Sequence, residues 1–201
     1  KKTKHLFFNS SILIDETYQS VIDKKVGLSI FSPPYANCFD YCEVSKMEIW
    51  LGDFVHEYRD FDKFREQAIR SHVNSKFDHT INNQNTKVDT IASLINTYNV
   101  WNKNIPDMIR GYFDDMEEVL KRISNLIGKG DYCYIVVANS SYKEIVVPTD
   151  LLLADIGVKL GFKVEKIIAA RQMRSSSQQA PELKSQSLMR ESVIILTKQK
   201  S

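Results

Sequence analysis

The residues best suited to chemistry in this chain are Ser32, Pro33, Pro34 and Tyr35, which directly follow the apolar run Val26–Phe31. A short, continuous apolar run bounded by turn residues is typical of a buried parallel strand. Two successive prolines end such a strand, because each ring fixes φ at about −65° and removes a backbone N–H donor. The chain therefore turns at the carboxyl end of a strand, where open α/β sheets bind their ligands. This turn suits a flat ring bearing an amino group, because its oxygens accept the amine hydrogens and the tyrosine stacks on the ring.

The tetrapeptide resembles the catalytic motif of the DNA amino-methyltransferases, which move a methyl group from S-adenosylmethionine to an exocyclic base amine. The resemblance implies catalytic roles for Ser32, Pro33, Pro34 and Tyr35. The Ser32 hydroxyl and the Pro33 carbonyl would accept the amine hydrogens, and Tyr35 would stack on a flipped base. The serine form of the motif favours the 4-amino group of cytosine, with the 6-amino group of adenine as the alternative. An ordinary Pro-Pro turn that ends a strand is the structural alternative.

Two further segments resemble the same family in order and spacing. One continues the motif after Tyr35, and the other, Arg190-Glu191-Ser192, resembles the Arg-Glu-Ser that opens the last strand. The resemblance implies DNA as the substrate, with contacts from these segments and from the loop before the last strand: Asn37, Phe39, Asp40, Tyr41, Arg171, Gln178 and Arg190. Two alternatives stay open, because Asp40 fits a helix N-cap equally well, and Arg171 and Gln178 also fit a solvated surface loop.

Length and composition set bounds on the class of protein. The 201 residues, 43% hydrophobic and 26% charged, fit one globular domain. A formal net charge of +2 gives no global signature of nucleic-acid binding, so phosphate contacts must be local. The apolar runs are too short for a membrane helix, and the three cysteines lack metal-site spacing. We therefore expect a cytoplasmic protein with reduced cysteines and no bound metal.

Strands and helices alternate along the chain, which predicts an α/β fold. We expect strands at residues 5–8, 26–31, 132–138, 162–170 and 191–197, and helices at 15–24, 41–58, 88–101, 107–127 and 149–160. The 41–58 helix is predicted to be amphipathic, and the 132–138 strand to be buried on both faces. The resemblance implies a partial Rossmann-like class I methyltransferase fold, with a mostly parallel sheet and an antiparallel edge hairpin. Residues 1–201 would form one catalytic domain, in which 61–104 is a candidate target-recognition insert by position.

One part of the family's pattern is missing from this sequence. The family binds S-adenosylmethionine at a glycine-rich turn after the first strand, where a Cβ would block the close approach of the backbone. The sole Gly-x-Gly here, at Gly128 and Gly130, follows a predicted helix and precedes a strand. The resemblance places only Asn9 and Ser10 at the cofactor.

The missing glycine turn predicts that other elements complete the sheet. Without them the 26–31 strand would present an open apolar edge, which is an aggregation hazard. We therefore expect an amino-terminal segment or a partner subunit to supply the first strands and the cofactor loop. The alternatives are a recognition subunit that has lost cofactor binding, and an enzyme that methylates RNA or a glutamine amide in protein.

Overall fold

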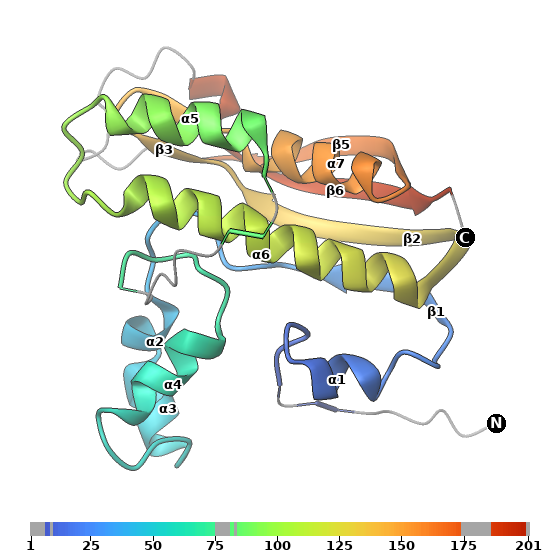
Figure 1. Ribbon diagram of the computed structural model, residues 1–201, viewed down its shortest axis with the longest axis horizontal. Helices are drawn as coiled ribbons and strands as arrows, with labels where there is room; N and C mark the ends of the chain where they lie inside the picture. The colour runs from blue at the N-terminus through green and yellow to red at the C-terminus, as the bar shows by residue number, and fades with distance from the viewer. Residues whose placement is uncertain (1–6, 9, 75–80, 83, 174–185, 200–201) are drawn as a thin grey trace.

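The computed structural model describes residues 7–8, 10–74, 81–82, 84–173 and 186–199. Its centre is a four-stranded sheet in the order β1-β2-β6-β5 (Figure 1). β1 (Val26–Phe31) runs parallel to β2 (Ile127–Ala138), whereas β6 (Arg190–Lys198) is antiparallel to both β2 and β5 (Phe162–Gln172). Three of the four strands therefore point the same way, and β5 and β6 form a hairpin at one edge. The predicted α/β class, mostly parallel sheet and antiparallel edge hairpin are confirmed.

A layer of helices covers one face of this sheet (Figure 1). α6 (Ile105–Leu126) packs along β2, α7 (Thr149–Lys159) packs on β5 and β6, and α5 (Thr86–Asn96) lies against α6. Pro106 stands in the first turn of α6, where a missing N–H costs no hydrogen bond. The apolar residues that predicted this helix are buried at helical spacing: Met108, Ile109, Tyr112, Met116, Val119, Leu120 and Ile123.

The remaining elements are short and lie outside the four-stranded sheet. In Figure 1, α2, α3 and α4 form a group that extends away from the sheet. β3 and β4 pair as a separate antiparallel hairpin. In chain order the short elements are α1 (Asp15–Gln19), α2 (Tyr41–Val44), α3 (Lys46–Leu51), α4 (Asp60–Gln67), β3 (Ser140–Tyr142), β4 (Ile145–Val147) and the 3₁₀ turn η1 (Gln186–Leu188).

Two predicted elements differ in the structure. Phe7 and Phe8, the described part of the predicted 5–8 strand, are not in a strand. The predicted 41–58 helix is interrupted at Ser45 and is replaced by the two short helices α2 and α3. Part of its apolar stripe stays in solvent, with Met47 67% and Leu51 80% exposed, whereas Val55 is buried. Helical spacing marks a face that can be buried, but burial requires a partner surface.

The second face of the sheet is apolar and exposed. Cross-strand partners place eight large apolar side chains on this side, which we call the open face: Leu28, Ile30, Tyr132, Tyr134, Val136, Ile168, Val193 and Ile195. The same registers place the polar side chains of Lys163, Lys166, Glu191 and Thr197 there as well. Ile30 is 67% and Tyr132 43% exposed, whereas Cys133 and Ile135, which point to the helices, are fully buried. The prediction that residues 132–138 are buried on both faces is therefore wrong for this chain, because the described helices that pack on the sheet lie on its other side.

Candidate active site at the end of strand β1

The Ser-Pro-Pro-Tyr corner lies where β1 ends. Ser32 directly follows Phe31, the last residue of the strand, and its side chain is exposed, whereas Pro33 is buried beneath it. The Ser32 hydroxyl donates a hydrogen bond of 3.0 Å to the carbonyl of Val136, near the end of β2. Because that bond uses its only hydrogen, the Ser32 oxygen is left with lone pairs that accept.

Tyr35 is fastened to β6 by its hydroxyl. The hydroxyl donates to Glu191, and the second carboxylate oxygen of Glu191 lies 2.9 Å from the Nε of Arg171. Burial, together with the hydrogen bond to Glu191 and its negative charge, raises the pKa of Tyr35 to about 12. Tyr35 is therefore neutral at ordinary pH, and its ring is fixed by a bond between two distant parts of the chain.

The loop after Tyr35 is anchored from inside the protein. The hydroxyl of Tyr142 donates to the carbonyl of the buried Ala36 at 2.8 Å and lies 3.3 Å from the Sγ of Cys38. Cys38 has a φ of 65°, and its N–H donates to the Ser71 carbonyl at 3.1 Å. Burial raises the pKa of Cys38 to about 11, so this side chain stays a thiol.

Two aromatic rings stand in solvent beside the corner. Phe39 and Tyr41 are 43% and 42% exposed, and their ring centroids lie 4.9 Å apart, edge to face. The side chain of Asn37 accepts the N–H of Phe39 at 3.2 Å, which shapes the turn that carries them. The rings thus offer an accessible aromatic surface next to Ser32 in the chain.

Asp40 has a structural role in this fold. Its carboxylate caps α2 by accepting the N–H groups of Cys42 and Glu43, and it pairs with Arg65 at 3.1 Å. Burial alone would raise the pKa of Asp40, but the nearby charges of His72 and Arg65 outweigh burial and lower that pKa. The N-cap alternative describes the structure, and the 9% exposed side chain offers little surface to a substrate.

Arg190 also has a partner inside the protein. It pairs at 2.9 Å with Asp150, a fully buried residue in the first turn of α7, and the hydroxyl of Ser192 donates to the same carboxylate. Arg190 and Ser192 therefore tie β6 to α7, while Glu191 between them reaches Tyr35. This geometry favours a positioning role for Arg190 over direct contact with a substrate.

The structure does not test the predicted cofactor residues Asn9 and Ser10. Asn9 lies outside the described residues, as does Gln178, predicted to contact substrate. The hydroxyl of Ser10 shares a hydrogen bond of 2.5 Å with that of Thr17. Gly128 and Gly130 lie within β2, so their Gly-x-Gly does not form a turn from strand to helix.

Two further features are absent from the described residues: a metal-binding cluster and a membrane-spanning helix. Within the described ranges, no three His, Cys, Asp or Glu side chains gather in a way that could hold a metal ion. In the same part of the chain, no helix is both long and apolar enough to span a bilayer.

Three residues that matter to the corner were not singled out from sequence as site residues: Glu191, Tyr142 and Asp150. Glu191 belongs to the Arg-Glu-Ser segment, so that segment was a usable signal. Tyr142 and Asp150 follow β2 without a motif, and no spacing in the sequence relates them to their distant partners Ala36 and Arg190.

Comparison with known proteins gives relatives of one kind. No protein-family model matches the chain. Type II methyltransferase M.AvaI is 29% identical over 163 residues in the proteins from Nostoc sp. strain PCC 7120 and from Anabaena variabilis, covering 75% of this chain and 33% of each relative. Type II methyltransferase M.BsoBI of Geobacillus stearothermophilus is 24% identical over 187 residues, covering 82% of this chain and 35% of that protein. The chain thus spans about a third of the length of the curated relatives it matches.

The solved structures that resemble the chain match it only loosely. TTHA0409 from Thermus thermophilus, described as a DNA modification methylase, has a TM-score of 0.38 and 16% identity over 55% of this chain and 51% of its own. Its complex with S-adenosyl-L-methionine has a TM-score of 0.39 and 14% identity over the same shares.

Proposed function

We propose that this chain is the catalytic part of a DNA methyltransferase that moves a methyl group from S-adenosylmethionine to an exocyclic base amine, the 4-amino group of cytosine. The observation that carries the proposal is the Ser32 hydroxyl, which is exposed at the end of β1 and donates its hydrogen to Val136. An oxygen held in this way keeps its lone pairs for accepting, and an amine hydrogen can reach it because the residue is exposed. The similarity to type II methyltransferases supports the same conclusion.

The chemistry follows from the weakness of an aromatic amine as a nucleophile. Its lone pair is delocalised into the ring, and hydrogen bonds from its hydrogens to Ser32 and to the Pro33 carbonyl return electron density to nitrogen. When bound, S-adenosylmethionine supplies the methyl group on a sulfonium. The nitrogen takes the methyl carbon as the carbon–sulfur bond breaks, and the surplus proton of the amine passes to water. Ser32 acts here as a hydrogen-bond acceptor and needs no shifted pKa.

The base must leave the helix before its amine reaches this corner. Phe39 and Tyr41 offer an exposed aromatic surface on which a flipped base can stack, and Tyr35 is held beside the same corner by Glu191. Aromatic stacking of a base is worth about 1–3 kcal/mol. Arg171, 64% exposed and paired with Glu191, is a cation of this network that a phosphate or a base could reach.

The cofactor site requires elements beyond those described. We propose that an amino-terminal segment or a partner subunit adds a strand to the free edge of β1 and brings the glycine-rich loop. An apolar hollow of about 320 Å³ runs beside β1, lined by Val26, Phe31 and Pro33 and by Val119 and Ile123 of α6. A parallel sheet is normally covered on both faces, so the open face and this hollow together favour a docked α/β segment.

The test is to incubate the full-length protein with DNA and methyl-labelled S-adenosylmethionine, and then to digest the DNA to nucleosides. We expect label in N4-methylcytosine, and Ser32→Ala should lower the rate constant of transfer about 100-fold, the loss typical of one removed hydrogen-bonding group in an active site. Ser20→Ala, which removes an exposed hydroxyl of α1's C-cap, is the matched control and should leave the rate unchanged.

Other results of this assay would favour one of the alternative functions. Label in N6-methyladenine would assign the adenine form of the reaction. Label in RNA or protein and none in DNA would overturn the DNA substrate. Absence of transfer from a preparation that binds S-adenosylmethionine and DNA would overturn the enzyme, and binding of DNA without binding of S-adenosylmethionine would favour the recognition subunit that has lost cofactor binding.

A further inference from the structure

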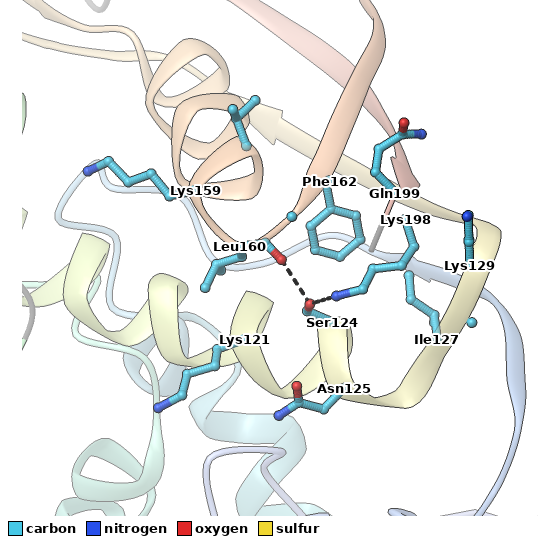
Figure 2. A pocket seen from close by; sticks show the side chains of 13 residues that line it. Lys121, Ser124, Asn125, Ile127, Lys129, Lys159, Leu160, Phe162, Lys198 and Gln199 are labelled. Carbon is cyan, nitrogen blue, oxygen red and sulfur yellow. Dashed lines mark hydrogen bonds between the residues drawn. The ribbon is translucent and has the colours of Figure 1, made fainter. Parts of the chain in front are cut away.

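A second hollow lies at the opposite end of the sheet from Ser32 (Figure 2). It has a volume of about 940 Å³ and is formed where β2 and β5 begin, where β6 ends, and where α6 and α7 finish. Ile127, in its wall, pairs with Val26 at the start of β1, whereas Ser32, held by Val136, follows the end of that strand. From Val26 to Ser32 is six positions, which at about 3.3 Å per residue is about 20 Å, so this hollow is no part of the proposed active site.

The hollow is lined by cations. Lys121, Lys129, Lys159 and Lys198 come from four different elements or their ends, and none of the described lining residues is acidic. In Figure 2 the side chain of Lys198 reaches inward to Ser124, whereas the side chains of Lys121 and Lys159 extend outward from the edge of the hollow. Four positive charges around one cavity attract an anion, because a concave wall of one sign focuses the electrostatic field.

Lys198 is the buried member of this set. Its residue is 8% exposed, and its Nζ donates to the hydroxyl of Ser124, which itself donates to the carbonyl of Leu160 at 3.1 Å. The ring of Phe162 lies 5.3 Å from the Nζ. Burial lowers the pKa of Lys198, and among the described residues no carboxylate pairs with it. A buried ammonium held by one hydroxyl and one aromatic ring, without a carboxylate, is incompletely compensated.

Helix termini account for only part of this charge. The carboxyl ends of α6 and α7 each carry about half a negative charge, and Lys121 pairs with Glu118 at 3.3 Å. Asp131, which accepts the N–H of Gly128, lies near the rim and offsets one more charge. Burial raises the pKa of Glu117, the charges of Lys159 and Lys121 act against that rise, and this carboxylate offsets a further charge. The buried ammonium of Lys198 has no carboxylate partner among the described residues, so it is the cation that an anion would compensate.

We propose that this hollow binds a phosphate group, with Lys198 and Ser124 at its floor and Lys129 and Lys159 at its rim. A volume of about 940 Å³ admits a nucleotide-sized ligand. The phosphate belongs either to a free phosphate ester or to the backbone of DNA, and the two share the same recognition chemistry. The proposal stands independently of the proposed function, because it uses none of the residues of the Ser32 corner.

The test is calorimetric titration of the purified protein with inorganic pyrophosphate in a phosphate-free buffer of low salt. We expect saturable binding at one site and an increase in melting temperature with pyrophosphate. Lys198→Met keeps the length of the side chain, removes the ammonium, and should weaken binding tenfold or more. Lys103→Ala removes an exposed lysine elsewhere and is the matched control, with unchanged binding expected.

A second pair of lysine variants and a competition with DNA complete the test of the phosphate site. Lys129→Ala with Lys159→Ala, two exposed positions, tests the site without altering the interior, and should also weaken binding. Displacement of pyrophosphate by a duplex of about 20 base pairs, long enough to span a single protein domain, would identify backbone phosphate as the occupant, whereas no displacement would identify a free phosphate ester. Absence of pyrophosphate binding, or binding at wild-type strength in both sets of lysine variants, would overturn the proposal.

Discussion

At the scale of single residues, folding makes the hydroxyl of Tyr35 harder to deprotonate. Burial, and then Glu191, raise the pKa of Tyr35 from 10.0 to about 12. A group with a higher pKa in the folded state than in the unfolded chain stabilises the fold at pH values below its pKa in the unfolded chain. That stabilisation is lost as the pH rises from the pKa of the unfolded chain to that of the folded protein. We therefore expect the free energy of unfolding to fall between pH 10 and about 12, measured by urea unfolding at each pH.

Variants isolate this effect from other tyrosines that titrate at high pH. Tyr35→Phe should remove the Tyr35 share of the fall, so the difference between the two proteins measures it. Glu191→Gln keeps a hydrogen-bond acceptor and removes the negative charge, which should lower the pKa of Tyr35 in a tyrosinate absorbance titration. An unchanged titration in Glu191→Gln would show that Glu191 does not hold Tyr35 as the structure places it.

Sequence alone identified site residues of the corner only within the local motif. Ser32 and Tyr35 were recognised because four adjacent residues have a chemical meaning together. The partner of Tyr35 is 156 positions away in the chain, and only the folded sheet brings β6 beside β1's end. The structural role of Asp40 was one of two interpretations from sequence, and its carboxylate contacts with Arg65 decide between them.

At the scale of elements, the tie between α7 and β6 rests on one buried carboxylate. Asp150 is fully buried and accepts from Arg190 and Ser192. Asp150→Ala would leave the Arg190 charge without its partner, which we expect to lower the free energy of unfolding by about 3–5 kcal/mol. Asp155→Ala on the same helix is the control, because its partly exposed pair with Lys87 should be worth about 1 kcal/mol or less. Equal losses in thermal or urea unfolding would contradict this account.

Elements were predicted well where their periodicity met a partner in the fold. α6 was found from spacing alone, since its apolar face lies on the sheet, and β1 matches its predicted bounds. The β3–β4 hairpin was missed because its turn places Lys143 at a φ of 55°, a conformation that an Asn or Gly would have signalled. The 41–58 prediction was wrong for the opposite reason: its periodicity is clear, but among the described residues only Trp50, stacked on Phe61, and the buried Val55 find a packing partner, while Met47 and Leu51 stay exposed.

At the scale of the whole molecule, helices cover one face of the sheet, whereas the open face stays partly exposed. Helices bury Cys133 and Ile135 completely, whereas Leu28 and Ile30 of the open face are 50% and 67% exposed at the free edge of β1. Exposed apolar area on a sheet beside an unpaired edge marks a site of association. The distribution of burial thus supports, independently of any motif, the proposal that a completing segment docks on this face.

This docking surface can be tested at Ile30. Ile30→Lys places a charge on the open face, so we expect the free energy of unfolding of this chain to change by about 0.5 kcal/mol or less, as at other exposed positions. The same substitution should prevent a segment from packing there, and should therefore abolish S-adenosylmethionine binding and methyl transfer in the full-length protein. Leu151→Lys, 46% exposed on α7, is the control and should leave both intact. Full cofactor binding by Ile30→Lys would mean that the cofactor half docks elsewhere, while a large loss of stability would mean that Ile30 already lies in a core.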